Sequence, residues 1–184
     1  MLRSLLSLAK TFRHSLEGVN PENETEMLVR CQVLSYNLRM PNYKFFDHTA
    51  DIGVEISGRT KKELFANAAK ALFDVLIENN DSKIKSAEKT QERPKTIIVK
   101  GADLEDLLIN FLRETLYLFN GQGWIVDNCE IKECGNKRLK ARLMGEPFNK
   151  KKHSIKTEIK AITYSGLSVE KQKSGWMARV IFDV

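Results

Sequence analysis

The sequence has few cysteines, and their spacing excludes the usual zinc sites and disulfide frameworks. Its 184 residues include only Cys31, Cys129 and Cys134, and no C-x-x-C pair occurs. A structural zinc site takes four cysteine or histidine ligands, and no histidine pair accompanies these thiols. We therefore expect reduced thiols without a structural role, as is usual for a cytosolic protein.

Long hydrophobic runs and the short motifs of common enzyme classes are also missing. No apolar stretch approaches the roughly 20 residues that a membrane-spanning helix requires, so no membrane partner is expected. The sequence contains no G-x-S-x-G elbow, no P-loop and no obvious nucleophile–base pair. These absences disfavour a free-standing hydrolase built on His48, Asp51 and Asp183.

The composition that remains is typical of a folded domain with a basic excess. Hydrophobic residues make up 42% and charged residues 29% of the chain, which fits a globular protein. The formal charge is +6, and lysines cluster at Lys150–Lys152 and Lys171–Lys173. This excess favours phosphate-rich partners, but lysine-rich solvated surfaces are common, and both interpretations stay open.

The first 41 residues lack a sustained hydrophobic pattern, and we expect a flexible N-terminal extension over residues 1–41. Its opening stretch is rich in arginine, lysine, serine and leucine and has no acid before Glu17, which is similar to a mitochondrial presequence. An extension without a targeting role, or a start at Met40, explains the same residues. We expect the folded domain over residues 42–184, in the cytoplasm or nucleus, with mitochondrial targeting as the alternative.

The patterned part of the chain predicts two helices. A capping box at Thr60–Glu63 opens the first helix, whose apolar pairs continue to Ile77. Asp103 is the expected N-cap of the second helix, which ends at the glycines of 121–123. The polar stretch between Glu78 and Lys95 lacks aromatic residues and is expected to be a mobile connection.

Strand patterns surround these helices and set the expected fold class. Alternation from Ile52 to Ile56 indicates a half-buried strand before the first helix. Further strands are expected at 96–99, 124–132, 139–144, 155–164, 167–171 and 176–184, the last two forming a hairpin. The pattern predicts an α+β fold of two layers, in which a largely antiparallel or mixed sheet packs against the two main helices.

Oxygen ligands stand at the ends of two of these strands. Asp51 precedes the strand from Ile52, and alternation in the last strand turns Phe182 to the core and Asp183 away from it. Val184 adds a terminal carboxylate. If the two strands pair antiparallel, Asp51, Asp183 and Val184 meet, and such oxygens suit magnesium, manganese or calcium. The alternative is that these aspartates are solvated or cap turns, as is common at strand ends.

Four other residues are weaker candidates. His48 could orient the neighbouring aspartate, or it could be an ordinary hydrogen-bonded histidine. A glycine–glutamate–proline turn and the lysines after it could form a basic lip for a partner, with Glu146 and His153 as partner-facing residues. Lys160 lies inside an expected strand, where a lysine usually faces solvent.

Several motifs in the same order resemble the archease family. The resemblance covers Tyr43 to the last residue, and the N-terminal extension is its one departure from compact members. The motifs are Asp47–Gly53 (DHTADIG), Asp106–Leu108 with Phe111–Glu114, Gly145–Pro147 with His153, Ile159–Tyr164, and Val180–Val184.

The resemblance implies an activator of an RtcB-type RNA ligase in tRNA splicing, and not an enzyme. It implies that the protein promotes the guanylylated histidine intermediate of the ligase and so permits multiple turnover. It also implies a divalent metal ion (calcium, magnesium or manganese) at Asp51, Asp183 and Val184, no nucleotide cofactor, and contact with tRNA only through the ligase.

The alternative function is a basic tRNA-binding or chaperone module that recruits RNA-processing partners. Basic contacts to phosphate would make its RNA affinity strongly dependent on salt. No RRM, KH or zinc-knuckle signature supports this alternative, and aromatic residues do not interleave with the basic clusters.

Overall fold

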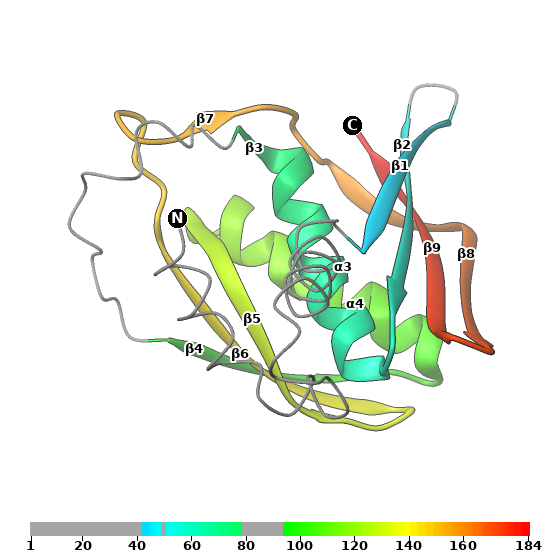
Figure 1. Cartoon of the computed structure of the whole chain (residues 1–184). Helices are drawn as coiled ribbons and strands as arrows, with labels where there is room; N and C mark the ends of the chain where they lie inside the picture. The colour runs from blue at the N-terminus through cyan, green and yellow to red at the C-terminus, as the bar shows by residue number, and fades with distance from the viewer. Residues whose placement is uncertain (1–41, 49–50, 79–93) are drawn as a thin grey trace, which may run out of the picture. The chain divides into compact units, whose positions relative to one another are not determined.

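The structure, a computed structural model, describes residues 42–48, 51–78 and 94–184. The expectations for residues 1–41, which include the targeting segment and Cys31, lie outside the described residues. The same holds for the connection at 79–93. The helices and strands keep the labels of Figure 1.

A four-stranded antiparallel sheet joins the first and last strands of the folded unit. Its strand order is β1-β2-β9-β8. β2 pairs with β9 so that Ile52 is opposite Phe182, and alternate residues of both strands enter the core. The predicted antiparallel pairing of these two strands is therefore confirmed. The strands span Tyr43–His48 (β1), Asp51–Gly58 (β2), Ala161–Gln172 (β8) and Gly175–Asp183 (β9).

A three-stranded antiparallel sheet forms the other wall of the core, with the order β4-β6-β5. In its central strand, Leu139, Ala141 and Leu143 are fully buried, and Lys140 and Arg142 alternate with them on the outer face. The short strands β3 and β7 form a separate two-stranded sheet. The bounds are Ile77–Glu78 (β3), Lys95–Lys100 (β4), Trp124–Cys134 (β5), Arg138–Pro147 (β6) and Ser154–Ile155 (β7).

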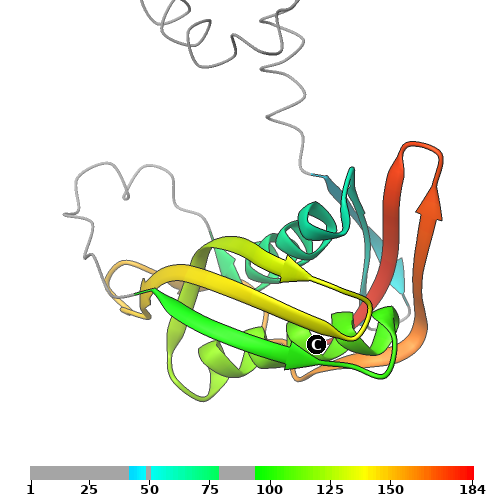
Figure 2. The same ribbon diagram turned by 90° about the horizontal axis from the view of Figure 1, so that it is seen from below.

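Two helices, α3 (Lys61–Leu76) and α4 (Leu104–Asn120), lie between the two larger sheets (Figures 1 and 2). α3 packs against β2 and β5, and α4 packs against β8 and β5. The two helices meet where the rings of Phe65 and Phe111 pack edge to face, with their centroids 5.6 Å apart. After α4 the chain turns at Gly123, whose φ of 58° suits glycine. The α+β class and the antiparallel pairing are confirmed.

Both helices begin at the residues that the sequence predicts. The side chain of Thr60 accepts the N–H of Glu63 at 3.1 Å, and Asp103 accepts the N–H of Asp106 at 2.9 Å. The expected capping box is wrong in one detail, since Glu63 accepts the N–H of Arg59 at 2.7 Å and not that of Thr60. Asp106 likewise accepts the N–H of the residue before Asp103. Each acid thus satisfies a donor one residue outside the helix cap.

Strand boundaries differ from the sequence pattern at several places. Residues 43–48 form β1, although the sequence pattern predicts no strand there. The strands expected at 155–164 and 167–171 are wrong as separate elements, because β8 is one strand from Ala161 to Gln172. Its pairing with β9 shifts between Thr163 and Ser168, and Gly166 takes a φ of 62° inside this irregularity. β8 therefore accommodates extra residues without leaving the sheet.

Candidate metal centre

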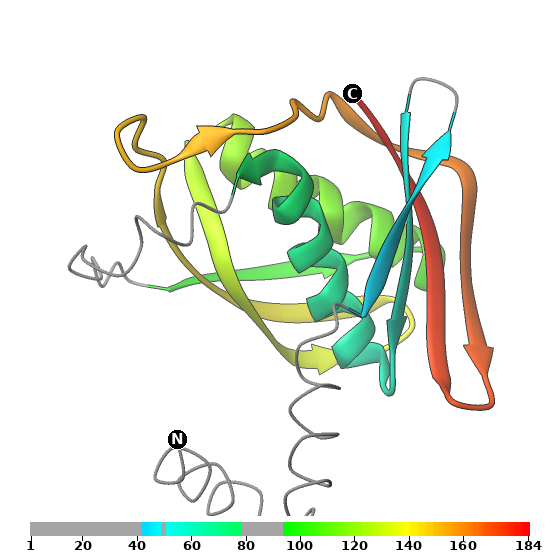
Figure 3. The same cartoon turned by 45° about the horizontal axis from the view of Figure 1, so that its top comes forward.

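Asp51 begins β2 and Asp183 ends β9, at the same end of the four-stranded sheet. The last pair of the β2–β9 ladder at this end is Ile52 with Phe182, and each aspartate is the next residue along its strand. Continuing this register by one residue would bring the two aspartates to neighbouring positions on one face of the sheet. Both aspartates are half-buried. Figures 1 and 3 show the chain end after β9 at the same end of the sheet as the end of β1 and the start of β2.

Each aspartate is paired with a residue of the neighbouring edge strand. His48 of β1 pairs with Asp51, and Ala161 of β8 pairs with Asp183. His48 is thus a strand residue in register with the first aspartate. Its side chain lies outside the described residues, so its expected role in orienting Asp51 stays a prediction.

Lys160 reaches the end of β9 from the opposite edge of the sheet. Its main-chain N–H donates to the main-chain oxygen of Asp183 at 2.9 Å, and its ammonium group donates to a main-chain oxygen of Val184 at 2.8 Å. The expectation that this lysine lies inside a strand is wrong, because β8 begins one residue later. The side chain therefore brings a positive charge to the end of the sheet that holds the two aspartates.

The donors at this end suit a hard divalent cation if main-chain oxygens and water complete the shell. Among residues 42–48, 51–78 and 94–184, no three histidine, cysteine, aspartate or glutamate side chains form a group that could hold a metal. Asp51 and Asp183 offer carboxylate oxygens, and Val184 offers a main-chain oxygen that Lys160 already contacts. Calcium and magnesium accept such oxygen ligands together with water.

A groove of about 300 Å³ lies between β1, the start of β2, the end of α3 and the segment before β8. Its lining combines apolar side chains with one lysine, and the rings of Phe45 and Phe46 remain 46% and 38% exposed. The groove includes Ile52, the residue after Asp51, so an apolar surface adjoins the charged end of the sheet. The residues that line it are Phe45, Phe46, Ile52, Val75, Lys156 and Thr157.

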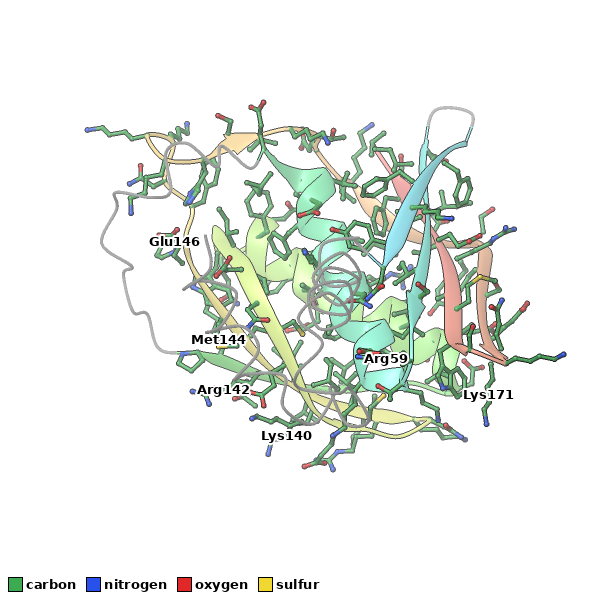
Figure 4. The ribbon with its side chains drawn as sticks, in the orientation of Figure 1. Arg59, Lys140, Arg142, Met144, Glu146 and Lys171 are labelled. Atoms are coloured by element: carbon green, nitrogen blue, oxygen red, sulfur yellow. The ribbon has the colours of Figure 1, made fainter. Side chains whose placement is uncertain are left out.

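Glu146 and His153 contact each other but are not brought to the aspartates. Nε2 of His153 lies 3.3 Å from Oε1 of Glu146, and its Nδ1 accepts the N–H of Asn149 at 3.0 Å. In a neutral imidazole the proton is therefore on Nε2. Figure 4 places Glu146 on the left of the view, far from the chain end after β9 in Figure 1. The turn expected at Gly145–Pro147 is wrong, because these residues extend β6.

Side chains of α4 contact the start of β8, which the sequence analysis did not foresee. The hydroxyl of Tyr164 donates to Asp106, and the guanidinium of Arg113 lies 5.0 Å from the Tyr164 ring. The hydrogen bond lowers the pKa of Asp106 and raises that of Tyr164, since it favours the carboxylate and the neutral phenol. One feature of the sequence could have indicated these contacts: Asp106 and Arg113 are seven residues apart, which places both on one face of the helix.

Comparison with known sequences decides the family. The sequence model of the Archease protein family matches residues 43–184. The chain belongs to the archease family. An archease of Methanosarcina barkeri is 40% identical over 147 residues, which cover 77% of this chain and 95% of that protein. An archease of Pyrococcus abyssi is 39% identical over 150 residues, which cover 79% of this chain and all of that protein.

A solved archease-like structure agrees with this assignment. The solution structure of protein 1598 of Methanobacterium thermoautotrophicum is 28% identical to this archease with a TM-score of 0.60, over 79% of this chain and 100% of that one. The resemblance predicted from the motifs is confirmed. Within the described part of this archease, neither helix has the length and apolar character needed to cross a membrane.

Proposed function

We propose that this archease binds a divalent cation between Asp51 and Asp183 and activates an RtcB-type RNA ligase in tRNA splicing. Such ligases join an RNA end that bears a phosphate to a 5′-hydroxyl through a guanylylated histidine. The archease would promote formation of that intermediate and so permit repeated turnover. The observation that supports the proposal is that Asp51 and Asp183 each adjoin the last β2–β9 pair, Ile52 with Phe182, in a chain of the archease family.

The charges at this end of the sheet support a role in phosphoryl chemistry. Two carboxylates brought together on neighbouring strands would repel, which would cost stability unless a cation lay near them. A divalent cation would supply Lewis-acid stabilisation of the charge that develops on phosphoryl oxygens during guanylyl transfer. Asp51 and Asp183 would hold the ion, and Lys160 would keep the end of β9 in place through Val184.

The exposure of the centre supports an activator and not a free-standing catalyst. The two aspartates are half-buried and Lys160 is exposed, so a partner can approach the same ion. The adjoining groove has no charged group besides Lys156. We therefore assign this archease no catalytic residue of its own, and we place the reacting histidine and nucleotide on the ligase.

The test is ligation by purified ligase at substrate excess, with and without the full-length chain. We expect the wild-type chain to raise product well beyond one turnover, and Asp51→Asn or Asp183→Asn to reduce this stimulation at least about tenfold, because each removes one of two charged donors. Asp127→Asn, at an exposed position of β5, is the matched control and should stimulate like wild type. Wild-type stimulation by both site variants would refute the metal centre.

A titration of tRNA separates this proposal from the basic RNA-binding alternative. If the chain acts through the ligase, its own affinity for tRNA should be negligible even at low salt. A tRNA affinity that falls steeply between two salt concentrations would instead indicate direct phosphate contacts.

A further inference from the structure

Helix α4 presents a row of polar side chains to the chain that leads into β8. Asp106, Arg113 and Asn120 are spaced by seven residues, which is close to two turns, so they share one face of the helix. We call these three residues the polar stripe. The buried residues of the helix are apolar except for Thr115, and the stripe lies outside this buried set.

Each member of the polar stripe contacts a different residue between 159 and 164. The stripe runs antiparallel to this segment, because its last residue contacts the start of the segment. The contacts are Asn120 Nδ2 to the oxygen of Ile159 (3.3 Å), Arg113 Nη2 and Nε to the oxygen of Ile162 (3.0 and 3.3 Å), and Tyr164 hydroxyl to Asp106.

Lys160 lies between two of these contacts. The oxygen of Ile159, just before it, accepts from Asn120, and the oxygen of Ile162, two residues later, accepts from Arg113. Lys160 itself donates to the main-chain oxygens of the last two residues, as described above. The polar stripe thus holds main-chain oxygens on both sides of Lys160, whose own N–H and ammonium groups contact the end of β9.

The start of β8 needs such support because its own pairing is short. β8 is an edge strand, and it pairs regularly with β9 only from Ala161 to Thr163 before the register shifts. The residues before Ala161 belong to no strand back to Ile155. A ladder of three residues at a sheet edge opens easily unless side chains from another element hold it.

We propose that the polar stripe of α4 positions Lys160 and the end of β9, and so sets the geometry of the candidate cation site. Arg113 is the central positioning residue, because two of its N–H groups engage one carbonyl oxygen while its guanidinium stacks on Tyr164. None of these side chains touches the cation. The inference rests on the proposed function for its effect on the ligase, but it also predicts changes in the isolated chain.

The test measures Mn²⁺ affinity, amide hydrogen exchange and thermal unfolding of the full chain and its variants. Arg113→Met keeps the apolar part of the side chain but removes the guanidinium group. We expect about tenfold weaker Mn²⁺ binding, the effect of losing a charged hydrogen bond. Exchange at Ala161–Thr163 should quicken by a similar factor. Arg113→Lys keeps the positive charge but has no planar guanidinium group, and it should recover part of the Mn²⁺ affinity and part of the exchange protection. Arg138→Met, which removes an exposed partner of Glu133, should change neither.

A second pair of variants guards against a failure of Arg113→Met to fold. Tyr164→Phe removes only the hydroxyl that contacts Asp106, and we expect about two- to threefold weaker Mn²⁺ binding, because a single exposed hydrogen bond contributes little. Tyr117→Phe is the control. Tyr117 lies on α4, the helix that carries the polar stripe, and its exposed fraction of 56% resembles the 50% of Tyr164. This control should bind like wild type.

The outcomes separate this inference from the proposed function. The positioning role would be overturned if Arg113→Met and Tyr164→Phe both kept wild-type Mn²⁺ affinity and wild-type exchange at Ala161–Thr163. The contacts of the stripe would then only join the helix to the sheet. If the wild-type chain binds no Mn²⁺, the proposed function falls, and the exchange rates alone decide whether the stripe orders the segment around Lys160.

Discussion

Gly145 of β6 lies so close to β5 that no side chain fits at this position. A Cβ there would lie 1.8 Å from the main-chain oxygen of Ile125, and the two strands are paired at this point, with a register shift next to it between Val126 and Asn128. Backbone atoms on both sides cannot retreat without breaking the ladder. The glycine of the family's GEP motif therefore has a packing explanation that needs no ligand.

At this position we expect Gly145→Ala to lower the free energy of unfolding by about 3 kcal/mol, the upper end of what overpacking costs. Denaturant unfolding measures the change. The control is Gly135→Ala in the same hairpin, where the new Cβ would meet only the oxygen of Arg138 at 3.5 Å. That variant should stay within about 0.5 kcal/mol of wild type. Equal stabilities for the two variants would contradict the close approach of the strands.

At the scale of elements, the two helices begin in the same way. Thr60 and Asp103 accept a main-chain N–H from the third helical residue, and the acid at that third position accepts an N–H from the residue before the cap. Each helix start therefore satisfies two donors with two side chains. This arrangement fixes where α3 follows β2, and it places the start of α4 beside Tyr164.

The cap of α3 makes a prediction for this element. Thr60→Ala removes the acceptor for the N–H of Glu63, and we expect the unfolding free energy to fall by about 1 kcal/mol. Thr60→Ser keeps an oxygen at the same place and should recover most of the loss. Thermal or urea unfolding of the two variants distinguishes them, and a Thr60→Ser variant as unstable as Thr60→Ala would show that the methyl group matters and not the cap.

At the scale of the whole molecule, buried groups make stability depend on alkaline pH. Burial raises the pKa of the Cys129 thiol to about 12. Burial also raises the pKa of Tyr43, and so does its hydrogen bond to Asp74. A group whose pKa is raised in the folded state keeps its proton there while the unfolded chain loses it. Its contribution to stability is therefore complete below the unfolded pKa and is lost above it.

We expect the free energy of unfolding to fall as pH rises from about 9 toward 12, by a few kcal/mol at most. Cys129→Ala should flatten this dependence, because the unfolded chain then has one thiol fewer to ionise. Urea unfolding at several pH values measures the slope. A slope that Cys129→Ala leaves unchanged would indicate that other groups control the alkaline loss.

The parts of this archease that the sequence predicts are those set by local pattern. Thr60 and Asp103 identify the helix starts, and alternation alone places Phe182 and Asp183 on opposite faces of β9. The antiparallel pairing of β2 with β9, on which a shared site depends, is confirmed by the register, and the cation site of Asp51 and Asp183 stays a prediction.

The rest depends on contacts between distant segments, which a local pattern does not contain. A period of two says that a strand has one buried face, but it does not say which strand is its neighbour, so the division into separate sheets was not predicted. The ammonium of Lys160 meets Val184 only because of where residues 156–160 pass. Arg113 meets Ile162 only because that segment crosses the polar face of its helix.

The pairing of β2 with β9 has a consequence for biosynthesis. Loop closure between these strands spans nearly the whole folded unit, and such non-local pairing forms late in folding. A nascent chain still lacking β9 therefore has Asp51 without Asp183. Under the proposed function, such a truncated copy would lack one of the two carboxylates that hold the cation, so we expect it not to stimulate the ligase.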